Sequence, residues 1–185
     1  SIKAKSLDGQ EKFANNNLIR FSTVSPHTVN AGSDIITNAP ITISEASSTG
    51  ISYKWTANSN AVSFNNDSLL KPIVSASTSG TYILSLESTD SLNRKITDTL
   101  VLTWDNIPPS LTALPSVTVG ETYSVDANVV GAHNILWEEL SNTGNISFSS
   151  PNSPSTDISA NLDGNYSIRV TATDLAGNQS SSTFS

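Results

Sequence analysis

Residues 80–90 read Gly-Thr-Tyr-Ile-Leu-Ser-Leu-Glu-Ser-Thr-Asp, and residues 164–174 read Gly-Asn-Tyr-Ser-Ile-Arg-Val-Thr-Ala-Thr-Asp. In both stretches Gly, Tyr and Asp stand at the same offsets, and the second and fourth residues after the Tyr are apolar. A period of two is typical of a β-strand that buries one of its faces. The two stretches therefore predict one strand that is present twice in the chain.

The similarity extends upstream of these strands. Phe64 and Phe148 each stand 18 residues before the Tyr of their own copy, and Trp55 and Trp137 precede the two Phe residues. Self-similarity at a fixed period is the sequence signature of a repeated structural unit. The chain therefore contains one module written twice.

The first residues of the chain fit the end of the same module. Residues 1–8 align with residues 167–174, so that Asp8 corresponds to Asp90 and Asp174. This alignment predicts the same acidic corner at three places in the chain.

We therefore divide the chain into three parts. Residues 1–25 are expected to be the final hairpin of a preceding Ig-like repeat, and two whole copies follow at 26–105 and 106–185. The alternative for residues 1–25 is an N-terminal extension with a short helix over 8–19, but the three Asn residues at 15–17 disfavour a helix interior. Two strands alone are marginal in water, so we expect this hairpin to be mobile, packed on the next domain or completed by another chain.

Every periodic segment has the period of a strand, and turn-forming residues separate the segments. No stretch shows helical amphipathicity over three turns. The predicted fold is therefore all-β, with two tandem Ig-like antiparallel β-sandwiches preceded by an orphan β-hairpin. The residues of the expected strand stripes are Ile41, Ile43, Ile51, Tyr53, Trp55, Tyr82, Leu84, Leu86, Leu100, Leu102 and Trp104 in the first copy, and Tyr123, Val125, Ala127, Val129, Ile135, Trp137, Tyr166, Ile168, Val170 and Ala172 in the second.

Three motifs resemble a known family. Val-Asn-Ala-Gly-Ser-Asp at 29–34, Tyr-Lys-Trp at 53–55 and the Gly-x-Tyr…Asp strand are similar to the PKD (polycystic kidney disease) domain family, and the bacterial Ig-like repeats of surface proteins are a close second. In place of the Asp-Phe-Gly-Asp-Gly segment of typical PKD domains, residues 56–60 read Thr-Ala-Asn-Ser-Asn. The resemblance implies extracellular modules that space, display or adhere, often in tandem beside an enzyme or adhesin domain.

Composition excludes several classes of protein. The 185 residues carry 9 basic and 16 acidic side chains and contain neither Cys nor Met. The lack of Cys removes disulfides, thiolate metal sites and Cys nucleophiles, and fits a bacterial envelope or secreted protein. The acidic balance argues against nucleic acid as a partner, and no apolar run is long enough for membrane insertion. A chain that starts at Ser1 and lacks Met is expected to be a processed or excised piece of a larger precursor.

No catalytic constellation stands out. His27 and His133 lie outside any nucleophile or metal-protease motif, so both are expected to be solvent-exposed loop residues. Glu138 and Glu139 are neighbours on an expected strand and must point to opposite faces, so they cannot flank one scissile bond. The sequence therefore predicts no enzyme.

Calcium is the one cofactor that the sequence suggests. Asp105-Asn106-Ile107-Pro108-Pro109 resembles the Asp-Asn-x-Pro linker of cadherin repeats, which implies Asp105 and Asn106 as weak Ca²⁺ candidates. The other cadherin motifs are missing, and the first linker, at 23–27, offers no carboxylate. We expect no bound metal or cofactor, and we expect Asp90 and Asp174 to accept backbone N–H groups as turn caps.

The predicted function is that of a structural module. Pro26 and Pro108-Pro109 at the junctions fix φ and remove donors, which should stiffen the linkers. The chain is expected to be a non-catalytic, stiff tandem-repeat spacer or adhesive stalk at the cell surface or outside the cell, with neighbouring repeats of the same protein as partners. The alternative is a carbohydrate- or protein-binding accessory module of a secreted enzyme or adhesin, in which Trp104, Tyr123 or aromatic residues in the loops stack on an extracellular protein or glycan.

Overall fold

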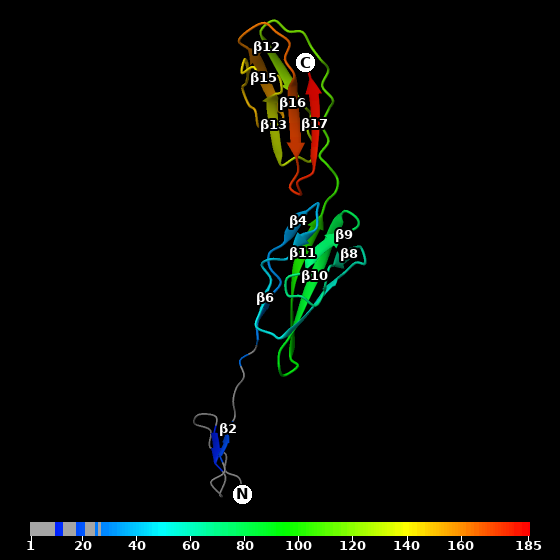
Figure 1. Cartoon of the computed structure of the whole chain (residues 1–185), viewed down its shortest axis with the longest axis vertical. Helices are drawn as coiled ribbons and strands as arrows, with labels where there is room; N and C mark the ends of the chain where they lie inside the picture. Colours follow the sequence, from blue (N-terminus) through cyan, green and yellow to red (C-terminus); the bar gives the residue numbers. More distant parts are fainter. Residues whose placement is uncertain (1–9, 13–17, 21–24, 26) are drawn as a thin grey trace.

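The computed structural model describes residues 10–12, 18–20, 25 and 27–185, and every regular element among them is a β-strand. Ordered by sequence, the strands form a short hairpin and two larger groups, domain 1 (residues 27–105) and domain 2 (residues 106–185), which lie end to end (Figure 1). The strands are β1 (Gln10–Lys12), β2 (Leu18–Arg20), β3 (Val29–Asn30), β4 (Ile35–Thr37), β5 (Ile41–Thr42), β6 (Ser47–Ser48), β7 (Ser52–Ala57), β8 (Val62–Phe64), β9 (Ile73–Ala76), β10 (Gly80–Thr89), β11 (Lys95–Trp104), β12 (Thr122–Asp126), β13 (Asn134–Glu139), β14 (Ile146–Phe148), β15 (Ser155–Ala160), β16 (Ile168–Thr173) and β17 (Gln179–Phe184). No helix long and apolar enough to cross a bilayer occurs among these described residues.

Each domain is an Ig-like β-sandwich, as predicted. In domain 1 a sheet with the order β4-β11-β10-β7 packs on a sheet with the order β5-β9-β8, and β3 pairs with β6. In domain 2 the sheet β13-β16-β17 packs on the sheet β12-β15-β14. Among the described strands all pairs are antiparallel except that of β4 with β11, which is parallel and places β4 at the edge of its sheet.

A buried Trp stands at the centre of each core, as predicted. Trp55 and Trp137 are 1% and 2% exposed, and each lies on the strand that closes one edge of its sheet. The Trp55 ring lies 6.0 Å from the Phe64 ring, whereas Trp137 meets Phe184 edge to face at 6.4 Å. Both indole Nε1–H groups donate to a backbone carbonyl, 3.3 Å away in domain 1 and 2.8 Å away in domain 2. Each ring is therefore buried without an unpaired donor.

The Gly-x-Tyr motif has a physical reason in both domains. The Tyr82 hydroxyl donates to the Thr78 carbonyl at 2.8 Å, and that of Tyr166 donates to the Leu162 carbonyl at 2.7 Å. The ring thereby folds back over the Gly two residues earlier, and a Cβ on Gly80 would lie only 3.1 Å from the Tyr82 hydroxyl oxygen. This contact corresponds to the tyrosine corner of Ig-like folds.

Three expected core positions are wrong. Ile51 is 70% exposed because it lies beyond Ser52–Thr89, the last pair of the ladder between β7 and β10. Ile41 is 38% exposed because β5 has only two residues and Ile43 alone fills the core there. Tyr166 precedes β16 and, unlike the half-buried Tyr123, does not pack against the core of domain 2.

The N-terminal hairpin is present, but its strands differ from those of the alignment. β1 (Gln10–Lys12) pairs with β2 (Leu18–Arg20), whereas the residues that follow Asp90 and Asp174 at the offsets of β1 lie between strands. In both domains the third residue after the Asp has a positive φ, 59° at Asn93 and 92° at Gly177. The corresponding residue is Glu11, for which a left-handed conformation is costly. The predicted corner at Asp8 itself lies outside the described residues.

The tyrosine contact predicts a specific loss of stability. We expect Tyr82→Phe to lower the free energy of unfolding of domain 1 by roughly 1 kcal/mol, because the hydroxyl loses a partly buried hydrogen bond. Urea unfolding monitored by Trp fluorescence measures this change. Tyr123→Phe is the matched control, because the Tyr123 hydroxyl makes no hydrogen bond within the described residues. Equal effects of the two substitutions would contradict this account of the motif.

Candidate functional site

Each domain carries a hydrogen-bonded turn at its N-terminal end, which we call the corner turn (90–94 in domain 1, 174–178 in domain 2). The Asp90 Oδ1 accepts the N–H groups of Leu92 and Arg94 at 2.9 Å, and its Oδ2 accepts the Arg94 Nε–H at 2.6 Å. The Asp174 Oδ1 accepts the Asn178 N–H, and its Oδ2 accepts the Asn178 side-chain amide, both at 2.9 Å. The prediction that these two Asp residues cap turns is confirmed.

These bonds stabilise the ionised carboxylates. Partial burial raises the pKa of the Asp90 carboxyl, but the hydrogen bonds from Arg94 and Leu92 outweigh it, so the pKa lies below its ordinary value. Burial likewise raises the pKa of Asp174, and the side-chain and backbone donors of Asn178 and its neighbours outweigh it. Both corner turns therefore depend on a charged Asp.

The linker between the domains is hydrogen-bonded to both of them. Asp105 N donates to the Thr37 carbonyl at 3.0 Å, and Asn106 N donates to the Ser79 Oγ at 2.9 Å, which ties the linker to domain 1. Ser110 exchanges two backbone bonds with Val130 of domain 2, at 3.0 and 2.9 Å. Only residues 107–109 lie between these points, and two of the three are Pro.

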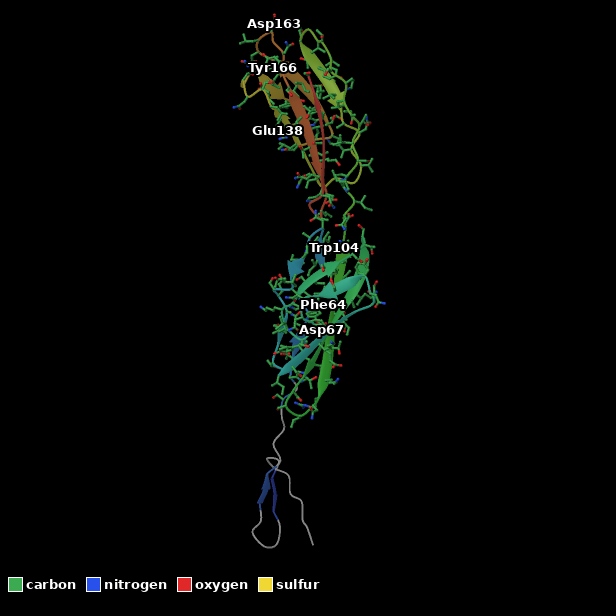
Figure 2. The ribbon with its side chains drawn as sticks, turned by 45° about the vertical axis from the view of Figure 1, so that its right-hand side comes forward. Phe64, Asp67, Trp104, Glu138, Asp163 and Tyr166 are labelled. Carbon is green, nitrogen blue, oxygen red and sulfur yellow. The ribbon has the colours of Figure 1, made fainter. Side chains whose placement is uncertain are left out.

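Asn178 joins the corner turn of domain 2 to domain 1. Its Nδ2 donates to the Asp105 carbonyl at 2.7 Å, and its Oδ1 accepts the Asn38 side-chain amide at 3.0 Å. The same Nδ2 donates to Asp174, which fixes the orientation of the amide. One half-buried side chain thus contacts its own turn, the linker and the loop after β4 of the other domain. Trp104, the residue before Asp105 and the last of β11, is labelled in Figure 2.

The N-terminal end of domain 1 is built in the same way. Arg94 holds the same position in its corner turn as Asn178 does, and its Nη2 donates to the Ser25 carbonyl in the preceding linker at 3.2 Å. His27 reinforces this end, because its Nε2–H donates to the Ser88 carbonyl at 3.0 Å and its Nδ1 lies 3.5 Å from the Asp90 Oδ2. The side chain of His27 is only 6% exposed, so the expected solvent-exposed loop His is wrong.

Sequence reasoning missed Asn38 and Asn178. Asn178 does carry a signal, because Arg94 and Asn178 both follow a corner Asp by four residues and both have side-chain N–H donors. Asn38 carries no signal in the sequence, since a single Asn in a loop is ordinary in a chain of this composition. Its role depends on the arrangement of the two domains.

The other site residues considered in the sequence analysis do not come together in one site. The Asp105 Oδ1 accepts the N–H of Ile107 within its own turn, and Asn106 follows it in the linker, so the Ca²⁺ candidates lie at the junction as expected. Among the described residues, no three His, Asp or Glu side chains form a group that could hold a metal ion. Glu138 pairs with Arg169, whereas Glu139 accepts bonds from the Thr143 loop, so these carboxylates point apart as predicted. His133 is exposed.

Of the two residues named as a ligand platform, Trp104 is buried and Tyr123 is half-buried. Trp104 is 4% exposed and belongs to the core of domain 1, so stacking on a ligand is excluded and that expectation is wrong. Its position at the end of β11 buries it opposite Gly80. Tyr123 is half-buried and packs against the core of domain 2.

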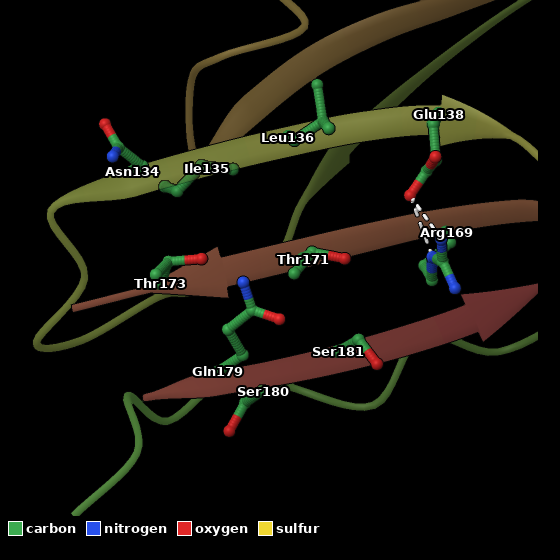
Figure 3. Close-up of a pocket in the computed structure, with 10 residues that line it drawn as sticks. All are labelled: Asn134, Ile135, Leu136, Glu138, Arg169, Thr171, Thr173, Gln179, Ser180 and Ser181. Carbon is green, nitrogen blue, oxygen red and sulfur yellow. Dashed lines mark hydrogen bonds and ion pairs between the residues drawn. The ribbon is translucent and has the colours of Figure 1, made fainter. Parts of the chain in front are cut away.

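Domain 2 has a shallow groove on the outer face of one sheet (Figure 3). Its volume is about 490 Å³, and the ion pair between Glu138 and Arg169 closes one end. The lining residues are Asn134, Ile135, Leu136, Glu138, Arg169, Thr171, Thr173, Gln179, Ser180 and Ser181. Because no aromatic ring is among them, the groove offers no surface for stacking on a sugar.

Comparison with known proteins leaves the family open. No protein-family model matches the chain, and no curated protein matches it. A solved structure of SGBP-B from the Bacteroides ovatus mixed-linkage glucan utilization locus, in complex with a heptasaccharide, is 15% identical at a TM-score of 0.34, over 88% of this chain and 48% of that one. The fibronectin(III)-like modules of Clostridium thermocellum CbhA are 16% identical at a TM-score of 0.42, over 86% and 93%. The Ig1-2 module of the Drosophila receptor tyrosine phosphatase DLAR is 13% identical at 0.29, over 86% and 98%.

The chain spans about half the length of the first of these proteins. At these identities and TM-scores the similarities identify neither a family nor a ligand. Membership of the PKD-like family stays a prediction.

The charged corner turns predict a dependence of stability on pH. The Asp174 pKa is lower in the folded state than in the unfolded state, so its contribution is complete above the unfolded pKa and is lost as the pH falls through the folded pKa. We expect the free energy of unfolding to fall between about pH 5 and about pH 2, and we expect Asp174→Asn to flatten this fall. Asp163→Asn, at an exposed loop carboxylate, is the control and should follow the parent. Parallel pH curves for the parent and Asp174→Asn would contradict the prediction.

Proposed function

We propose that this chain is a non-catalytic, stiff tandem-repeat spacer of an extracellular or cell-surface protein, whose partners are neighbouring repeats of the same protein. The observation that carries this proposal is the hydrogen-bonded junction, in which Asn178 contacts Asp105 and Asn38 across the domain boundary. A spacer must transmit a fixed direction from one module to the next. A junction with few free backbone torsions meets that requirement.

The linker supports the proposal because few of its residues can change their backbone torsions. The segment 105–106 is bonded to domain 1, and Ser110 is bonded to domain 2. Of the three residues between, Pro108 and Pro109 have a fixed φ. Such a connection behaves as a semi-rigid spacer and differs from a flexible Gly/Ser linker.

The Asn178 amide supplies the contact that depends on sequence. Each neutral hydrogen bond is worth roughly 1 kcal/mol, so the bonds to Asp105 and Asn38 are modest one by one. Asp174 already holds the amide in the orientation that both contacts need, so little further side-chain entropy is lost when the domains meet. A preorganised contact of this kind narrows the range of angles between the domains.

A single substitution tests the junction. Asn178→Asp replaces the donor by an anionic oxygen that faces the Asp105 carbonyl and the Asp174 carboxylate, so we expect it to widen the distribution of distances between the domains. The chain has no Cys, so Cys introduced at the exposed positions Thr97 and Thr183 takes two spin labels without interference. Pulsed electron–electron double resonance then gives the distribution of distances between the two spin labels.

Asn165→Asp is the matched control, because it makes the same chemical change at an exposed loop residue of the same domain. We expect a narrow distribution for the parent and for this control. A broad distribution in the parent would overturn the spacer function. A narrow distribution in Asn178→Asp would show that the amide does not set the geometry of the junction.

A further inference from the structure

Domain 1 joins a strand near its beginning to its last strand by the one parallel pairing among the described strands. Ile35–Thr37 of β4 lies beside Leu102–Trp104 of β11, and we call this pairing the end-strand ladder. The Asp105 N–H donates to the Thr37 carbonyl at 3.0 Å and continues the ladder toward the junction. The segment that enters domain 1 and the strand that leaves it are therefore bonded directly to each other.

Two carboxylates extend this contact toward the end of domain 1 that carries the corner turn. The Asp34 Oδ1 accepts the Val101 N–H, and the Asp98 Oδ2 accepts the Ala31 N–H, both at 2.8 Å. Each bond joins the entering segment to β11 across 67 positions of the sequence. A carboxylate acceptor makes a charge-assisted bond, which is stronger than a bond between neutral groups. The entering segment is thus bonded to β11 from Asp98 to the end of the strand.

The parallel direction of the two strands decides how tension acts on this contact. The chain enters domain 1 at the end with the corner turn and leaves it at the junction, so tension along the rod pulls β4 and β11 in opposite directions (Figure 1). Parallel strands pulled in this way slide along each other, and all the bonds between them are loaded together. Such a rupture has a high barrier, and the barrier to unfolding governs unfolding under force.

Domain 2 holds its entering segment with fewer backbone bonds. Residues 106–121, all of them described, contain no strand. The Val117 N–H donates to the Ser185 carbonyl at 2.9 Å, and the Leu114 N–H donates to the Ser182 Oγ at 3.1 Å. The other bonds between these segments use serine hydroxyls, at 3.3 Å. The segment follows β17 without a ladder, so its contact offers less resistance to sliding.

We propose that the end-strand ladder makes domain 1 the load-bearing module of this chain, and that domain 2 is the module that unfolds first under tension. This inference rests on the proposed spacer function and deepens it, because a stiff spacer transmits force as well as direction. Domain 1 keeps its fold while domain 2 opens and lengthens the rod.

Unfolding each domain by force within the whole chain tests the proposal. Because the chain has no Cys, DNA handles for optical tweezers can be attached at chosen positions. Ser25→Cys with Ile107→Cys loads domain 1, and Ile107→Cys with a Cys added after Ser185 loads domain 2. Ser25 and Ile107 are both exposed, so the handles do not enter a core. We expect domain 1 to unfold at a higher force than domain 2 at the same loading rate.

A substitution tests the contact itself. Asp34→Ala removes the bond to the Val101 N–H, so we expect domain 1 to unfold roughly tenfold faster at constant force, which corresponds to one charge-assisted bond lost from the barrier. Asp67→Ala is the matched control, because Asp67 pairs with Lys54 on β7, at the edge of the sheet opposite β4. We expect this control to unfold at the rate of the parent. Urea unfolding of both variants verifies that domain 1 is folded.

The outcomes separate this proposal from the spacer function, which the spin labels at Thr97 and Thr183 test without force. A broad distance distribution there would overturn the spacer function and this inference with it. If the distribution is narrow but domain 1 unfolds at the same force as domain 2 or at a lower one, only the load-bearing role is overturned. If Asp34→Ala unfolds no faster than Asp67→Ala, the contact along β11 is not what resists force.

Discussion

The amide of Asn178 is the interaction on which the arrangement of the two domains depends. It belongs to the corner turn of domain 2 through Asp174, and it contacts the linker carbonyl of Asp105 and the side chain of Asn38 in domain 1. Because the turn orients the amide before the domains meet, a contact of a few hydrogen bonds can restrict a large relative motion. The internal stability of domain 2 and the geometry of the junction are therefore coupled through one residue.

The two domains stabilise their small cores with the same contacts and differ at their surfaces. With no disulfide available, each domain buries a Trp whose indole N–H is paired and closes its strands with a Tyr hydroxyl bonded to the backbone. Outside the core the repeat is free to diverge. Ile83 is 50% exposed on the outer face of domain 1, whereas the corresponding face of domain 2 carries the polar groove along β13, β16 and β17. Repetition of the core with divergence of the faces is consistent with modules that share an architecture and differ in their contacts.

The two corner turns have the same hydrogen-bonding pattern although one has Arg94 and the other has Asn178 at the fourth position after the Asp. The carboxylate of the corner Asp accepts either a guanidinium or an amide from the residue four positions later, because both groups carry N–H donors. The third residue has a positive φ in both cases, and Asn and Gly are the residues that tolerate it best. This requirement is local, and a left-handed conformation is costly for Glu11, the corresponding residue after Asp8, which lies in the strand β1.

The Gly-x-Tyr strands β10 and β16, the burial of Trp55 and Trp137 and the capping by Asp90 and Asp174 could be predicted from the sequence, because these features depend on the period of a pleated strand and on residues a few positions apart. The burial of His27 could not be predicted, since a polar residue beside Pro26 has no local reason to be buried, and the fold brings Ser88 and Asp90 to it across some sixty residues. The exposure of Ile51 likewise reflects where the ladder between β7 and β10 ends, at the pair Ser52–Thr89. The contact of Asn38 with Asn178 joins residues 140 positions apart, with no periodicity to announce it. Only the tertiary structure decides such contacts, because two side chains that belong to separate cores meet only after both cores have formed and the linker has fixed how they face each other.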